Sequence, residues 1–200
     1  MSNSDRIKTS LEIALERSAN IEVDKVALKR RELEHEGRRI AGMMISNNAV
    51  TLESQLKGRE KNDIEIIVNS IEEVLLSNIQ LPKNEVSLEL IKNEYEILIR
   101  IKENKKLIKK KISDIEHLFQ QYVEQLTLLE KQIAEELTPS LKKLEEQIGA
   151  QLGSKVKISP ESNPEYLKKR KAIIENFNAQ YNEQLLYLKN QIKNLENVSN

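Results

Sequence analysis

The clearest pattern in the chain is a heptad spacing of apolar residues between positions 108 and 133. Apolar residues recur there at alternating steps of four and three, which places them along one face of a helix. They are Ile108, Ile112, Ile115, Phe119, Tyr122, Leu126, Leu129 and Ile133. The spacing is typical of a coiled-coil seam. It predicts a long helix that packs its apolar stripe against another helix.

The seam continues on both sides with irregularities. Downstream, an extra step of four residues coincides with Thr138 and Pro139. Proline cannot donate the helical hydrogen bond, so we expect a kink there, or a fresh helix start with Thr138 as its N-cap. Upstream, the rhythm weakens at Lys102 and Lys105. We expect one helix from about residue 85 to residue 137, about 80 Å long at ~1.5 Å per residue.

Residues 149–164 read as a linker, because glycine, serine and proline punctuate them. Asn163 and Pro164 predict the start of a final helix, whose apolar face includes Phe177, Tyr181 and Leu188. Two amphipathic helices joined by a linker predict an antiparallel hairpin. A turn centred near residue 156 would pair residues whose numbers add up to about 313. The expected pairs are Leu137 with Phe177, Ile133 with Tyr181, and Leu126 with Tyr187 or Leu188.

The N-terminal part has a weaker pattern. We divide the chain into an N-terminal helical arm (residues 1–46), a helix (47–82) and a coiled-coil hairpin (83–200). In the arm, residues 20–24 are expected to interrupt the helix, with Asp24 as an N-cap. Gly37 and Gly42 indicate either a close helix approach through Gly37, Ala41 and Met44 or a frayed helix. The next helix is expected from about residue 50 to residue 81.

The fold class that follows is all-α and elongated, with a long central helix and a C-terminal antiparallel coiled-coil hairpin. All seven aromatic residues lie from Tyr95 onward. Aromatic side chains contribute much of a small core, roughly 150–250 Å² of buried surface each. We therefore expect the stable core from Tyr95 onward, and an arm that becomes ordered on a partner or on the rest of the chain.

Charge is balanced overall and segregated locally. Lys and Arg number 32, as do Asp and Glu, so the formal net charge is zero. Residues 47–82 carry 3 basic and 6 acidic side chains, residues 83–111 carry 9 and 5, and residues 112–136 carry 1 and 6. Zero net charge argues against a protein dominated by nucleic-acid attraction. Neighbouring blocks of opposite sign favour helix pairing instead.

Candidate chemistry is sparse. The chain has no cysteine, which excludes disulfides and thiol sites. His35 and His117 have no partner at metal-ligand spacing, and adjacent glutamates such as Glu72 and Glu73 point about 100° apart on a helix. We expect no cofactor, no metal and no enzymatic activity. With no signal-peptide stretch and no membrane span, we expect a cytoplasmic protein.

Three basic clusters are the best candidates for ligand contact: Arg30, Arg31, Arg38 and Arg39; Lys102, Lys105, Lys106, Lys109, Lys110 and Lys111; and Lys168, Lys169, Arg170 and Lys171. Acidic residues lie near each cluster, which favours salt bridges or protein partners over phosphates. The residues predicted to bind a partner are Leu11, Leu15, Arg30, Arg31, Gly37, Arg38, Arg39 and Ile40. The predicted coiled-coil core is Ile112, Ile115, Phe119, Tyr122, Leu126, Leu129, Ile133, Phe177, Tyr181 and Leu188.

Two stretches of the arm, residues 9–17 (TSLEIALER) and residues 36–42 (EGRRIAG), resemble the N-terminal block of uncharacterised helical bacterial proteins, including spirochaete ones. The resemblance implies a recurring interaction module and no activity. Richness in Ile, Lys and Asn is also typical of AT-rich bacterial genomes.

The function expected from the sequence is a non-enzymatic coiled-coil scaffold or adaptor that mediates protein–protein interaction, with a homodimer as one expected assembly. A chaperone or assembly factor that clasps a client with its arm is one alternative. A nucleic-acid-associated coiled-coil protein is the other, and we do not favour it.

Overall fold

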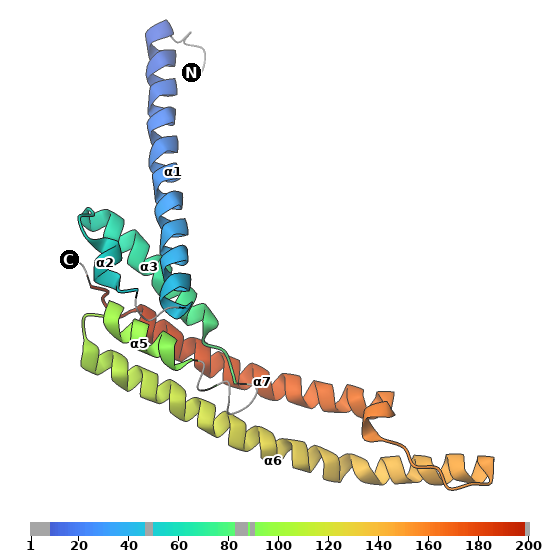
Figure 1. Cartoon of the computed structure of the whole chain (residues 1–200). Coiled ribbons are helices and arrows are strands. Elements are labelled where there is room, and N and C mark those ends of the chain that lie inside the picture. The colour runs from blue at the N-terminus through green and yellow to red at the C-terminus, as the bar shows by residue number, and fades with distance from the viewer. Residues whose placement is uncertain (1–8, 47–49, 83–87, 89–90, 199–200) are drawn as a thin grey trace, which may run out of the picture. The chain divides into compact units, whose positions relative to one another are not determined.

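The structure, a computed structural model, describes residues 9–46, 50–82, 88 and 91–198. The described helices are α1 (Ser10–Ser46), α2 (Leu52–Leu56), α3 (Lys61–Asn78), α5 (Lys92–Ile101), α6 (Lys105–Leu152) and α7 (Pro164–Lys193), with a 3-10 turn η1 at Pro160–Ser162 (Figure 1). No strand occurs among these residues; Lys102 and Asn197 form one isolated β-bridge. The predicted all-α class is confirmed, as is the long central helix that packs against the C-terminal helix.

The chain divides into two compact units. The first comprises residues 1–77 together with residues 100–103 and 197–200. The second comprises residues 78–99 and 104–196. Over the described residues, no helix is long and apolar enough to cross a membrane.

In the first unit, α1 is one continuous helix of 37 residues. It begins with a capping box: the Thr9 hydroxyl accepts from the Glu12 N–H at 3.3 Å, and the Glu12 carboxylate accepts from the Thr9 N–H at 2.7 Å. The predicted interruption at residues 20–24 is wrong. That stretch contains no Gly or Pro, and β-branched residues cost only a few tenths of a kcal/mol each within a helix.

The predicted single helix from residue 50 to residue 81 is also wrong, because Gly58 divides it. Gly58 has a φ of 78°, a left-handed conformation that side chains disfavour. Thr51 caps α2 by accepting from the Ser54 N–H at 3.3 Å. The sequence therefore forms a short helix, a tight turn and then α3.

Aliphatic side chains form the core of this unit without any aromatic residue. Ile40 in α1 and Ile67 and Ile71 in α3 are each 0% exposed. The expectation that the stable core begins at Tyr95 is therefore wrong. Burial of Ile, Leu and Met side chains contributes roughly 1.5–3 kcal/mol each, so enough of them can replace aromatic rings.

The predicted helix from residue 85 to residue 137 is divided at residues 102–104, and its predicted start at residue 85 lies outside the described residues. The helix α5 ends at Ile101, and α6 begins after Asn104, whose side-chain oxygen accepts from the Leu107 N–H at 2.9 Å. The weakened rhythm at Lys102 and Lys105 marks this division. The 48 residues of α6 correspond to about 72 Å at ~1.5 Å per residue.

The helix α6 does not restart at Pro139 but continues through it to Leu152. Thr138 is not an N-cap, because its hydroxyl donates to the carbonyl oxygen of Ala134 one turn earlier. Both Thr138 and Pro139 are exposed. A carbonyl that loses its helical partner at an exposed proline can bond to water, so the helix tolerates this position.

The antiparallel α6–α7 hairpin is present, but its predicted register is wrong. Tyr122 contacts Phe177 and Asn178, and Lys111 contacts Gln191, so facing residue numbers add up to about 300. The predicted partner of Phe177, Leu137, instead lines a groove with Tyr166, near the start of α7.

The register differs because the chain reverses at Gly153, three residues before the predicted centre. Gly153 has a φ of 64° and caps α6. The following residues run back beside α6 in extended form, and the Ile158 N–H donates to the Glu145 carboxylate at 2.7 Å. Each extended residue advances ~3.3 Å along the chain direction, whereas each helical residue advances ~1.5 Å. The extended linker therefore runs past more residues of α6 than a symmetric turn would, which lowers the sum of the facing residue numbers.

Candidate functional site

The predicted partner-binding residues separate into an exposed group and a buried group, both on α1. Leu11 and Leu15 are 70% and 61% exposed. Gly37 and Ile40 are buried. The four arginines of the set, Arg30, Arg31, Arg38 and Arg39, are exposed. We call residues 10–28 the outer segment of α1 and residues 33–46 its inner segment.

The inner segment is held against α3 at very short range. An added methyl group on Gly37 would lie 2.6 Å from the carbonyl oxygen of Ile67 and 2.6 Å from Cβ of Ser70. Only a glycine permits this approach. Of the two explanations for the glycines, the close helix approach is therefore correct for Gly37. Gly42 has open space around it.

Ion pairs hold α1 to the α2–α3 segment. Arg59 makes a bidentate contact with the Glu36 carboxylate at 2.9 and 2.7 Å. The Lys29 ammonium lies 2.9 Å from the Asp63 carboxylate and 3.9 Å from that of Glu60. The hydrogen bond to Asp63 raises the pKa of Lys29 above its usual value. These contacts, with the close approach at Gly37, fix one end of α1.

The outer segment carries further exposed apolar side chains that are not among the predicted partner-binding residues. Val26 is 71% exposed, Leu28 57% and Ile13 39%. Val26 precedes the buried Leu33 by seven residues, close to two helical turns, so the apolar stripe that is buried in the inner segment continues outward. The seven-residue spacing of this apolar stripe, followed outward from Leu33, could have identified Val26 from the sequence.

A buried ion pair lies elsewhere in the first unit. Lys102 is 0% exposed, and its ammonium lies 2.6 Å from the Glu72 carboxylate, whose side chain is 4% exposed. The Asn197 amide donates to the other Glu72 oxygen at 2.8 Å, and the Val198 N–H donates to the Ile101 carbonyl at 2.8 Å. Burial lowers the pKa of Lys102, while the nearby Glu72 opposes this shift. The cluster ties the C-terminal segment to α3.

The hairpin of the second unit is joined by three aromatic rings. Tyr122 of α6 stacks on Phe177 with centroids 5.5 Å apart, and meets Tyr181 edge-on at 5.2 Å. The Tyr122 hydroxyl donates to the Asn178 side-chain oxygen at 2.9 Å. Of the predicted core set, Ile112, Ile115, Phe119, Tyr122 and Ile133 are buried, and Leu126, Leu129, Phe177, Tyr181 and Leu188 are half-buried. These contacts are suited to packing rather than to chemistry.

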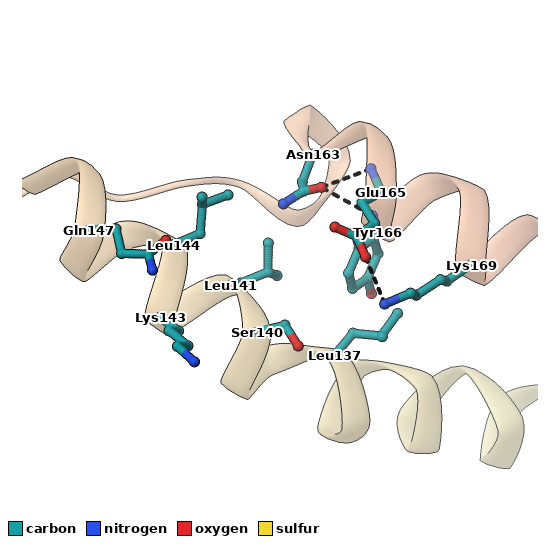
Figure 2. Close-up of a pocket in the computed structure, with 10 residues that line it drawn as sticks. All are labelled: Leu137, Ser140, Leu141, Lys143, Leu144, Gln147, Asn163, Glu165, Tyr166 and Lys169. Atoms are coloured by element: carbon teal, nitrogen blue, oxygen red, sulfur yellow. Dashed lines mark hydrogen bonds and ion pairs between the residues drawn. The ribbon is translucent and has the colours of Figure 1, made fainter.

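A groove of about 350 Å³ lies between α6 and the start of α7 (Figure 2). Leu137, Leu141 and Leu144 line its α6 side, and Tyr166 lies on its α7 side. Lys169 pairs with Glu165 at 2.8 Å and lowers the pKa of that carboxyl through their hydrogen bond. The Asn163 side chain caps α7. On the α7 side of the groove, Asn163, Glu165 and Lys169 thus serve the local helix start.

The basic clusters make internal contacts to different degrees. Lys102 is buried, the Lys105 ammonium donates to the Ile99 carbonyl at 2.8 Å, and Lys111 donates to Gln191 at 2.5 Å. Lys106, Lys109 and Lys110 are exposed on α6. In the other two clusters, acidic partners accompany Arg30, Arg39, Lys169, Arg170 and Lys171. No group of three His, Asp or Glu side chains among the described residues could hold a metal ion.

Comparison with known proteins gives one positive result. A sequence-family profile, "Family of unknown function (DUF6657)", matches residues 53–194. The range covers most of α2 and all of α3 to α7 and leaves α1 outside it, so the N-terminal resemblance to spirochaete proteins stays a prediction. No curated protein and no solved structure matches the chain. The chain belongs to the DUF6657 family of unknown function.

Proposed function

We propose that this protein is a non-enzymatic adaptor that binds another protein through the outer segment of α1. The observation that carries the proposal is the exposure of Leu11, Leu15, Val26 and Leu28 on a helix whose other end is fixed at Gly37. Exposed apolar side chains gathered on one element are typical of interaction sites. A fixed inner segment holds the outer segment ready for a partner, which lowers the entropy cost of binding.

Isolated helices are marginally stable in water, and helices in proteins gain most of their stability from packing. A helical segment whose described apolar side chains are exposed, as Leu11, Leu15, Val26 and Leu28 are, therefore gains stability when a partner covers it. The same reasoning supports a chaperone or assembly factor as the second candidate. Such a protein would use the outer segment for many clients, whereas an adaptor would bind one partner.

Site-specific photo-cross-linking tests the proposal. A photoreactive residue at Leu15 of the full-length protein, expressed in its natural host, should form a discrete conjugate. The matched control is the same residue at Leu186 on α7, since the two leucines are 61% and 58% exposed. One conjugate specific to position 15 supports an adaptor, and a broad set of conjugates supports a chaperone. Identical patterns at both positions, or none at position 15, would contradict the assignment of the outer segment as the binding site.

A further inference from the structure

Residues 197 and 198 follow the end of α7 and form a short strap within the first unit. The Asn197 side-chain amide donates to the side-chain oxygen of Asn69 at 2.9 Å and to the Glu72 carboxylate at 2.8 Å, so it spans about one turn of α3. The Val198 N–H donates to the Ile101 carbonyl oxygen at 2.8 Å. We call these two residues the C-terminal strap.

The strap lies beside a buried pair of opposite charges. Lys102 is 0% exposed, and its ammonium lies 2.6 Å from the Glu72 carboxylate. Asn197 contacts both members of the pair, because its side chain donates to Glu72 and its backbone forms an antiparallel bridge with Lys102. The strap is therefore part of the enclosure that shields this ion pair from water.

The described contacts of the strap are polar, whereas apolar burial holds α3 in place. Asn197 and Val198 are half-buried, while Ile67 and Ile71 of α3 are 0% exposed. A hydrogen bond that opens is replaced by hydrogen bonds to water, so its net contribution to stability is small. An apolar core becomes accessible only when the whole unit unfolds. The strap therefore opens at a lower free-energy cost than α3.

The buried ion pair lowers the cost of opening further. Moving two charges out of water carries a desolvation penalty that their mutual attraction offsets only in part. When the strap opens, water reaches Lys102 and Glu72 while the two side chains stay close together, so part of that penalty is recovered. Burial lowers the pKa of Lys102, and the hydrogen bond to Glu72 opposes this shift without cancelling it. The closed state thus disfavours the charge on Lys102.

We propose that the C-terminal strap is a releasable latch over the Lys102–Glu72 ion pair, which opens to water while α1 and α3 stay folded. In the open state the ammonium and the carboxylate become a charge pair at the surface. The latch gives the first unit a second conformation, and that conformation does not involve the outer segment of α1.

Lysine labelling of the full-length protein provides the first test. N-hydroxysuccinimide acetate modifies accessible amines, and mass spectrometry of peptides gives the rate at each lysine. Lys110, which is exposed, should react fast, and Lys102 should react more slowly. Low urea should leave the rate at Lys102 unchanged, because an opening strap exposes little surface. If Lys102 reacts only in urea that also abolishes the helical circular dichroism signal, global unfolding exposes it and the latch is overturned.

Substitutions in the strap provide the second test. Val198→Pro removes the N–H that binds the Ile101 carbonyl and should speed the labelling of Lys102 about tenfold. Val198→Ala keeps that N–H, so this matched control should change the rate by no more than about twofold. Asn197→Ala removes the side-chain bonds to α3 and should act in the same direction as Val198→Pro.

Helix content separates a latch from an ordinary part of the fold. Circular dichroism without urea should be the same for the wild-type protein and all three variants, because the helices stay folded when the strap opens. Equal labelling rates for Val198→Pro and Val198→Ala would overturn the proposal. A loss of helical signal in Val198→Pro would also overturn it, since the strap would then be required for folding.

Discussion

Replacing Gly37 with alanine tests the close approach of α1 to α3. The new methyl group would lie 2.6 Å from Cβ of Ser70, whereas carbon atoms in contact prefer about 3.5–4.0 Å. The other close atom is the backbone oxygen of Ile67, which cannot rotate away. The two helices must therefore separate by about 1 Å, which weakens the packing of Ile40 and Met44. Overpacking of this kind costs about 1–3 kcal/mol or more.

Alanine also has a higher helix propensity than glycine by about 1 kcal/mol, which offsets part of the loss. We expect Gly37→Ala to lower the free energy of unfolding by up to about 2 kcal/mol, measured by urea denaturation followed by circular dichroism. Gly42→Ala is the control in the same helix, because nothing lies within 4 Å of its added methyl group. It should raise stability by about 0.5–1 kcal/mol. If both substitutions stabilise the protein equally, the close approach is not a feature of the folded molecule.

Three further predictions concern buried polar groups. Lys102→Met should lower the free energy of unfolding by about 3–5 kcal/mol, because it leaves the Glu72 carboxylate buried without its cation. Adding Glu72→Leu should restore most of the lost stability, which a double-mutant cycle measures. Tyr122→Phe should cost about 0.5–1.5 kcal/mol through the lost hydrogen bond to Asn178, and an unchanged urea midpoint would contradict that contact. Burial raises the pKa of Tyr95 well above its usual 10.0, so the unfolded chain ionises first and stability should fall as the pH rises above about 10. Tyr95→Phe should flatten that pH dependence in urea titrations between about pH 9 and 11, and an unchanged slope would show that this phenol does not cause it.

Much of the secondary structure can be read from local signals. The heptad spacing from Ile108 to Ile133 identified the long helix, and Asn163 with Pro164 identified the start of α7. These signals act within a few residues, through face periodicity and capping hydrogen bonds. Composition also indicated helices throughout, since the chain has few glycines and prolines.

Boundaries that depend on competing forces were predicted less well. Pro139 looked like a helix start, but the exposed side of a long, packed helix tolerates a proline. The left-handed turn at Gly58 and the capping residue Asn104 divided segments that periodicity alone had joined. Gly37 could be read in two ways from the sequence, and only the distance to Ile67 distinguished them.

The sequence by itself determined that this protein is helical, which faces of its helices are apolar, and that its opposite charges lie in blocks. The tertiary structure decided the hairpin register, because that depends on an extended linker whose length per residue differs from that of a helix. It also decided that Lys102 is an internal charge rather than a surface one, and that α1 is packed at Gly37 and exposed at Leu15. Burial is a property of three-dimensional packing between residues far apart in the chain, so the same apolar stripe of α1 is buried from Leu33 to Met44 and exposed at Leu15 and Val26.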